Sequence, residues 1–316
     1  MVTQFAFNMP LVKFLAQSAG GQLAMVRSIG SALEDANIDA GLTSEHPAPS
    51  SDWLHNDPAA HDSLDPLNAL GFVGASPNRL KLFTNVRVLP YRNPFIPAKA
   101  AATLQILSDD RLLLGVGVGY QREEFDALGV NHRERGALTD EAIETIRLAW
   151  AGGSVVKQGR HFHAAGNEPR PVPNPPPPIW IGGGSDASVA RAPRLRDGWA
   201  PYLSVPTTDE TVMRSAVVSM AHFGEKVRSL HELREQHGRT GPFDIAVAPP
   251  SRPGDMSEAQ ARQFQDEVGE LQRLGATWIW TSLPARSLGH YLELVQWYGD
   301  IAARCRTDGK RDTAIG

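Results

Sequence analysis

Three consecutive glycines stand between an apolar run and a segment of helical period, in the stretch IWIGGGSDASVARA. Glycines at this place let backbone N–H groups approach an anion closely, and the helix start that follows adds free N–H groups and a positive dipole end. The pattern predicts a phosphate site made of four consecutive residues, Gly182, Gly183, Gly184 and Ser185. The alternative is a glycine-rich turn in which Ser185 or Asp186 only caps the helix.

A second candidate is His46, which closely follows an apolar run with strand character at 38–43. An imidazole at the end of a parallel strand faces the pocket, where it can donate or shuttle a proton near neutral pH. A lone histidine is also a common structural residue. The residue type therefore leaves a catalytic and a structural role open.

The polar run around His46 is rich in groups that bind metals, namely Asp52, His55, Asp57, His61 and Asp62. It lacks the HxH and HExxH spacings that are typical of metal ligands. His161 and His163 do form an HxH, in a short hairpin that we expect to be solvated. We therefore predict no metal, and a metal-dependent hydrolase built on the polar run is a competing hypothesis.

Neither a dinucleotide fingerprint nor a catalytic nucleophile is predicted. GVGVGY, from Gly115 to Tyr120, resembles a dinucleotide fingerprint, but the third glycine falls at Tyr120 or at Arg122. Its glycines instead predict close backbone packing at a strand end. The chain has no GxSxG elbow, and its single cysteine, Cys305, lies in a segment of helical period, so no candidate for a nucleophile is present.

The elements that must position these residues alternate between strands and helices. Strands are predicted at 4–9, 38–43, 80–89, 111–116, 178–182, 198–201, 243–248 and 276–281. Segments of helical period separate them, including 139–150, with Asp140 and Glu141 in its first turn, and a helix opened by a Ser257–Gln260 capping box. Eight such units predict a parallel sheet closed as a barrel, with its working face at the carboxyl ends of the strands. An open, doubly wound sheet is the competitor, because periodicity does not separate the two.

Composition excludes several classes of protein. The 31 basic and 35 acidic residues give a net charge of −4 with no basic stripe, so we expect no nucleic-acid partner. No run approaches the ~18 apolar residues that cross a bilayer, and the N-terminus does not resemble a signal peptide, so we expect no membrane association. With one cysteine, a reducing, cytoplasmic location is expected. The proline-rich stretch 169–178 predicts a rigid surface connection rather than a domain linker, which favours a single domain over residues 1–316.

Several separated blocks resemble the bacterial-luciferase-like family of flavin- and deazaflavin-dependent oxidoreductases. They lie at 82–128, 134–150 and 175–201, and the SEH after the second strand and the final WTSLP agree with them. Their order and spacing match over nearly the whole chain. The resemblance implies an α/β fold, the (β/α)8 TIM barrel, with insertions after strand two and before strand five.

The resemblance also implies a place for the cofactor ring. His46 matches a histidine that lies beside the isoalloxazine or deazaflavin ring in the family. Asn85 and Val86 occupy the position of a bulge in strand three, often with a non-proline cis peptide bond, that backs the central ring.

Further positions follow from the same resemblance. Val118, Gly119 and Tyr120 match the loop near the cofactor's polyol chain, and the glycine loop at 182–185 matches the one that takes its phosphate. Tyr120 stands where some deazaflavin dehydrogenases carry a carboxylic acid, which weakens an assignment as a sugar-phosphate dehydrogenase. The family's SGGR turn is SDDR here, at 108–111, and aspartate tolerates the left-handed backbone better than most residues.

With its ERGALTDE and GGGSD blocks, the chain resembles the deazaflavin branch of the family most. This resemblance implies an oxidoreductase that binds coenzyme F420 non-covalently and passes hydride to or from a small organic substrate. An FMN-dependent monooxygenase that uses reduced flavin and O2 is the alternative. A flavin-binding protein without catalysis is a hypothesis of another class. The resemblance further implies a homodimer and a separate flavin or F420 reductase as a partner, while the long polar run after strand two makes the substrate pocket individual to this protein.

Overall fold

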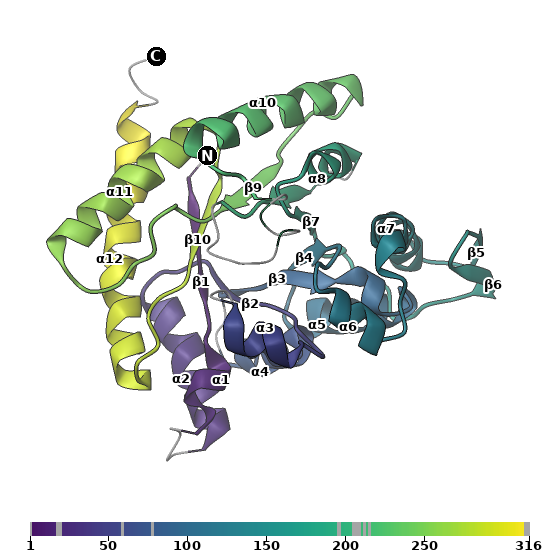
Figure 1. Cartoon of the computed structure of the whole chain (residues 1–316), viewed down its shortest axis with the longest axis horizontal. Coiled ribbons are helices and arrows are strands. Elements are labelled where there is room, and N and C mark those ends of the chain that lie inside the picture. The colour runs from purple at the N-terminus through teal and green to yellow at the C-terminus, as the bar shows by residue number, and fades with distance from the viewer. Residues whose placement is uncertain are drawn as a thin grey trace.

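The computed structural model describes residues 2–16, 21–57, 60–76, 79–194, 197–203, 210, 213 and 216–312. Eight parallel strands close into a barrel, so the barrel is confirmed and the open, doubly wound sheet is excluded (Figure 1). In the order in which they neighbour one another, the barrel strands are β1 (Gln4–Asn8), β10 (Trp278–Thr281), β9 (Asp244–Val247), β8 (Gly198–Ala200), β7 (Ile179–Gly182), β4 (Leu112–Gly117), β3 (Lys81–Val88) and β2 (Ala40–Thr43).

Helices surround the barrel, as expected for strands that are covered on both faces. They are α1 (Leu11–Leu15), α2 (Gln22–Asp35), α3 (Ser51–Asn56), α4 (Pro66–Gly74), α5 (Phe95–Leu107), α6 (Arg122–Ala127), α7 (Arg135–Trp150), α8 (Asp186–Arg191), α10 (Met220–Gln236), α11 (Glu258–Arg273) and α12 (Leu288–Asp312). Short 3-10 turns lie at η1 (Leu89–Tyr91), η2 (His132–Glu134) and η3 (Ala192–Arg194).

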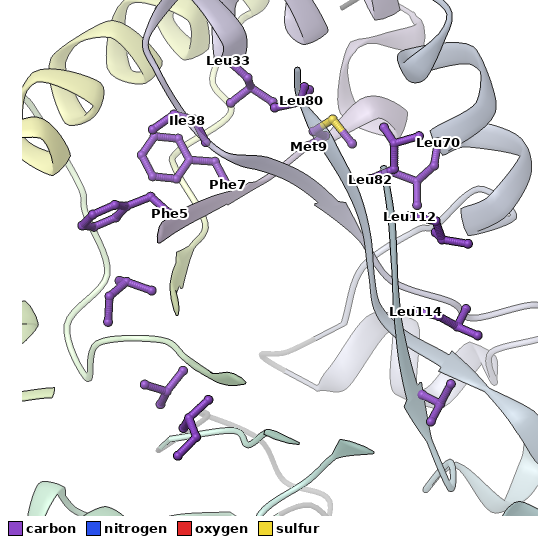
Figure 2. Packing of buried hydrophobic residues seen from close by; sticks show 14 of the residues in the cluster. Phe5, Phe7, Met9, Leu33, Ile38, Leu70, Leu80, Leu82, Leu112 and Leu114 are labelled. Atoms are coloured by element: carbon purple, nitrogen blue, oxygen red, sulfur yellow. The ribbon is translucent and has the colours of Figure 1, made fainter. Parts of the chain in front are cut away.

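The strands divide the core into an inner and an outer layer, because successive side chains point to opposite faces of a sheet. On β1, Phe5 and Phe7 pack outward against the helices, and Ala6 between them belongs to the cluster inside the barrel. Figure 2 shows part of the outer layer, with residues of β1, β3 and β4 beside helical residues such as Leu33 and Leu70.

Aromatic rings fill the inside of the barrel. The ring centroid of Trp180 lies 5.0 Å from that of Phe83 and 5.3 Å from that of Trp278. Gly198 on the neighbouring strand leaves the room that Trp180 needs, since a β-carbon there would lie 2.5 Å from Cδ1 of the indole. The barrel is therefore a packed support, and its chemistry must sit at a mouth.

Both expected insertions are present, one after the second barrel strand, β2, and one before the fifth, β7. The polar run after β2 contains α3 and leads into α4, two helices that the sequence analysis did not predict. The segment before β7 forms an antiparallel hairpin of β5 (Val155–Gln158) and β6 (His163–Asn167), which projects beyond α7 (Figure 1).

One expected helix start was wrong. Helix α7 begins at Arg135, four residues earlier than expected, so Asp140 and Glu141 lie in its second turn and not near its positive end. Asp140 pairs instead with Arg191 at 2.6 Å, and Glu141 accepts hydrogen bonds from the backbone of the β5–β6 turn.

The capping box is only half formed. Ser257 caps α11 by accepting the N–H of Gln260, as expected. The Gln260 side chain does not return the bond to Ser257, because its Oε1 accepts the N–H groups of Gly254 and Asp255. In the part of the chain that is described, no helix has the length and apolar character needed to cross a membrane.

Candidate active site

The predicted site residues come together because their strands are neighbours. β2, β3, β4 and β7 are consecutive in the barrel, and parallel strands end at the same mouth. His46 follows β2, Asn85 and Val86 lie in β3, Val118 to Tyr120 follow β4, and Gly182 ends β7. All of them therefore lie along one side of the barrel mouth.

Strand β3 carries the expected irregularity. Its pairing with β4 shifts between Thr84 and Arg87, and the Asn85–Val86 peptide bond is cis. The methyl groups of Val86 fill the space left by two glycines on the next strands. A β-carbon on Gly117 would lie 2.6 Å from one methyl of Val86, and one on Gly182 would lie 2.7 Å from the other.

This packing explains several glycines of both motifs. Gly115 cannot hold a side chain, because a β-carbon there would lie 2.1 Å from the carbonyl oxygen of Thr84. Gly119 has φ of 76°, and its missing side chain makes room for Val88 and Phe125. The prediction that GVGVGY serves close backbone packing is therefore confirmed.

Some of the polar groups in the glycine turn after β7 already make hydrogen bonds within the protein, which the sequence did not predict. The N–H of Gly183 donates to the carbonyl of Ala200 at 3.2 Å, and the carbonyl of Gly183 accepts from the indole of Trp199 at 2.8 Å. Ser185 caps α8, with its Oγ accepting the N–H of Ser188. Among the described residues, the N–H groups of Gly184 and Ser185 donate to no other group.

His46 is held by its Nδ1 atom. This nitrogen lies 3.3 Å from Oε2 of Glu124 and 3.1 Å from Nε2 of Gln121. Three aromatic side chains surround the imidazole, with centroid distances of 4.6 Å to Trp53, 5.0 Å to His61 and 5.9 Å to Tyr120. Trp53 and His61 come from the polar run, which therefore forms a wall beside His46.

Glu124 is a site residue that the sequence analysis missed. Its side chain is only 1% exposed, and it accepts the hydroxyl of Tyr91 at 2.8 Å and the N–H of Ala48 at 3.1 Å. Burial opposes ionisation, but the hydrogen bonds from His46, Tyr91 and Ala48 together lower the pKa of Glu124 below its ordinary value. Burial, followed by the nearby Glu124 charge, raises the pKa of Tyr91 above its ordinary range. The pair is therefore a neutral phenol and a carboxylate.

A second buried carboxylate fixes the end of β3. Oε1 of Glu45 lies 2.6 Å from Arg92, and its Oε2 accepts the N–H of Val88 at 2.7 Å. Arg87 lies 3.6 Å from the same carboxylate and 3.2 Å from Asp65. This network ties the polar run to the residues directly after the Asn85–Val86 bulge.

Sequence signals for these residues existed but were weak. Glu45, Tyr91 and Arg92 stand directly after predicted strands, at the barrel mouth. Glu124 lies in the stretch REEF, where a surface helix was as good an explanation. Within the described ranges no group of three or more His, Cys, Asp or Glu side chains is arranged to hold a metal ion.

Comparison with known proteins agrees with this architecture. A sequence model of the luciferase-like monooxygenase family matches residues 3–308. An F420-dependent glucose-6-phosphate dehydrogenase of Gordonia bronchialis is 31% identical over 176 residues, which are 54% of this chain and 50% of that protein. The enzyme of the same name from Nakamurella multipartita is 27% identical over 292 residues, 86% of this chain and 82% of that protein. The matches to the first curated relatives span about half of their length.

Solved structures share the fold at lower identity. An F420-dependent secondary alcohol dehydrogenase, in complex with an F420–acetone adduct, superposes with a TM-score of 0.74 at 14% identity, covering 95% of this chain and 98% of that one. A type II Baeyer–Villiger monooxygenase from Pseudomonas putida, in complex with FMN, gives 0.72 at 12% identity, covering 96% and 99%. At these identities the likeness establishes the fold alone.

Proposed function

The chain belongs to the luciferase-like monooxygenase family of oxidoreductases, and from that premise we propose that it binds coenzyme F420 non-covalently and uses it to move hydride to or from a small organic substrate. Two observations favour F420 over FMN. Three of the curated relatives, at 27–33% identity, are named as F420-dependent glucose-6-phosphate dehydrogenases. The site also offers His46, on a buried carboxylate, as a group that handles a proton.

The observation that carries the proposal is that His46 after β2, the bulge in β3 and the glycine turn after β7 belong to consecutive strands of the barrel, β2, β3, β4 and β7, and so lie along one side of its mouth. Asn85 and Val86 would back the cofactor ring. The loop of Val118, Gly119 and Tyr120 would border the cofactor's polyol chain.

The cofactor's phosphate would take the turn from Gly182 to Ser185. Gly182 serves this turn indirectly, because the room it leaves is filled by Val86. The amides of Gly184 and Ser185, which have no partner in the described part of the chain, would donate to the phosphate oxygens. The residues present therefore fit a ring bound over the bulge with its anionic end at β7.

The chemistry divides between cofactor and protein. When bound, the deazaflavin supplies the hydride acceptor or donor. In the oxidation of an alcohol, the C–H bond gives up hydride and the O–H bond gives up its proton to His46, leaving a carbonyl compound. In the reverse direction His46 returns the proton to the carbonyl oxygen. The aromatic wall of Trp53, His61 and Tyr120 would exclude water from this exchange.

A binding titration with two cofactors tests the proposal. Purified protein is titrated with F420 and, separately, with FMN, and quenching of fluorescence gives each dissociation constant. We expect saturable F420 binding and F420 reduction with members of a panel of small secondary alcohols. His46→Ala should keep F420 binding and lose on the order of 10²–10⁴-fold in turnover, while the exposed His55→Ala should change neither.

Three results would speak against it. Tight FMN binding without F420 binding would favour a monooxygenase that uses reduced flavin and O2 and needs a separate reductase. Bound cofactor without turnover, together with no effect of His46→Ala, would indicate a binding protein. Stoichiometric zinc in the purified protein would favour a metal-dependent hydrolase.

We also propose that the protein is a homodimer. Helices α4 and α5 are neighbours, and both expose large apolar side chains: Phe72 is 61%, Ile96 62% and Leu107 78% exposed. Ile96 and Leu107 are eleven residues apart and so lie on the same side of α5. Light scattering should give twice the monomer mass, and Ile96→Glu should shift it toward the monomer.

A further inference from the structure

We propose that Glu124 is a positioning residue that keeps the ring hydrogen of His46 on Nδ1, and thereby leaves Nε2 as the atom that accepts the substrate's proton. The inference deepens the proposed function and rests on it for the identity of the substrate proton. The hydrogen-bond pattern itself is a property of the protein without any ligand, and it can be tested separately.

Every hydrogen bond to Glu124 has a defined direction. A buried carboxylate only accepts, and Ala48 approaches Oε1 with a backbone N–H, which only donates. Tyr91 donates its hydroxyl to Oε2, at 2.8 Å. The same Oε2 lies 3.3 Å from Nδ1 of His46. A hydrogen on Nδ1 turns this last contact into a charge-assisted hydrogen bond, and a bare Nδ1 would place two acceptors side by side.

Gln121 competes for the same nitrogen. Its Nε2 lies 3.1 Å from Nδ1 of His46 and, as a donor, would favour a bare Nδ1. The carboxylate outweighs the amide, since a hydrogen bond to a charged group is about twice as strong as one between neutral groups. The Gln121 amide can also turn over and present Oε1, which is buried and has no partner among the described residues.

The consequence falls on the other ring nitrogen. A neutral imidazole with its hydrogen on Nδ1 has a lone pair on Nε2 and is ready to accept a proton there. No hydrogen bond links Nε2 of His46 to another residue in the described part of the chain. Once the proton arrives, the imidazolium carries a charge that Glu124 offsets at hydrogen-bond distance. Glu124 thus orients the imidazole and stabilises its charged form without touching the substrate.

Replacing Glu124 by Gln should move the ring hydrogen of His46 from Nδ1 to Nε2. The backbone N–H of Ala48 cannot change its role, so it holds the oxygen of the new amide. The amide NH2 then faces both Tyr91 and His46. A phenol oxygen and a bare Nδ1 can each accept from it. The E124Q variant should therefore carry the His46 hydrogen on Nε2, where it can no longer accept the substrate's proton.

The test is nitrogen NMR of the ligand-free protein with 15N-labelled histidine, at a pH of about 9, where neutral histidine predominates. The His46 signals are identified by their loss in His46→Ala. We expect the hydrogen on Nδ1 in the wild type and on Nε2 in E124Q. The matched control is Tyr91→Phe, which removes the other partner of the same Oε2 but keeps the carboxylate and the Ala48 bond. It should resemble the wild type.

The inference fails if the wild-type hydrogen is on Nε2, if E124Q leaves it on Nδ1, or if Tyr91→Phe reverses it as E124Q does. The wild-type spectrum decides by itself should E124Q not fold. Absence of F420 binding would refute the proposed function and leave this result standing.

A second measurement uses the active protein. E124Q should lower kcat/KM by about 100-fold and change the F420 dissociation constant by less than about twofold, because Glu124 acts on proton transfer. Equal kcat/KM in E124Q and wild type would overturn the inference.

Discussion

Gly182→Ala should destabilise the protein because it forces a methyl group against Val86. The new β-carbon would lie 2.7 Å from Cγ1 of Val86 and 3.2 Å from the carbonyl oxygen of Val116. Ordinary carbon–carbon contacts are about 3.5–4.0 Å, so the first distance is short by about 1 Å. The contact cannot easily be relieved, because the valine side chain is short and stiff and β7 is paired with β4 on this side.

Overpacking of this kind costs about 1–3 kcal/mol in the free energy of unfolding. For a chain of 316 residues, 1 kcal/mol corresponds to about 1.5 °C in Tm, so Tm should fall by about 1.5–4.5 °C. Gly269→Ala is the matched control. It lies inside α11 with nothing near its missing side chain, and alanine there should stabilise the helix by about 0.5–1 kcal/mol. The two Gly→Ala changes should therefore have opposite signs.

A double-mutant cycle with Val86→Ala identifies the contact. Once the valine methyls are gone, Gly182→Ala should cost little, giving a coupling energy of about 1 kcal/mol or more. Urea denaturation of the four proteins measures it. Additive effects of the two changes, or a Gly182→Ala variant as stable as wild type, would refute the packing of Val86 between β4 and β7.

Two further predictions concern charge. Glu45→Gln should lower the free energy of unfolding by about 3 kcal/mol, because it leaves the Arg92 guanidinium without its buried partner. Glu144→Gln, at the pair with Lys157 on the surface, is the control and should change the free energy of unfolding by less than about 0.5 kcal/mol in the same urea assay. Equal effects of the two changes would contradict the prediction. Burial raises the pKa of four of the five tyrosines, with Tyr202 and Tyr298 at about 12 and Tyr91 and Tyr291 also shifted upward. These tyrosines lose their protons at lower pH in the unfolded chain than in the folded one, so the free energy of unfolding should fall as the pH rises above about 10. In a pH titration, phenolate absorbance from these residues should appear only when the protein unfolds. Ionisation of all five tyrosines while the protein is still folded would contradict the prediction.

Local signals predicted most of the elements. Near-continuous aliphatic runs, as in β4, give the strand positions because both faces of each barrel strand are covered. The SDDR turn also followed its residue types, since Asp109 and Asp110 both have positive φ, at 53° and 61°. The start of α7 was misplaced because its first turn carries no strong cap: Glu134 makes no capping hydrogen bond with its side chain.

The resemblance to a family supplied what local patterns lacked. It gave the closed barrel, the place of the Asn85–Val86 bulge and the candidate role of His46. Helix α3 in the polar run after β2 was missed, although Ser50 caps it, because the run has few apolar residues to show a period. Helix α4, which Asp65 caps, was missed for the opposite reason: it is apolar over most of its nine residues and so lacks the polar face of an amphipathic helix.

The sequence by itself determined the order of strands and helices, the turns and the residue types available at each strand end, because these depend on neighbours in the chain. Tertiary structure alone decided which of those residues meet. Glu124 reaches His46 across 78 positions, and Val86 fills room left by glycines on two other strands. Such contacts depend on the register and closure of the barrel, which no short stretch of sequence encodes.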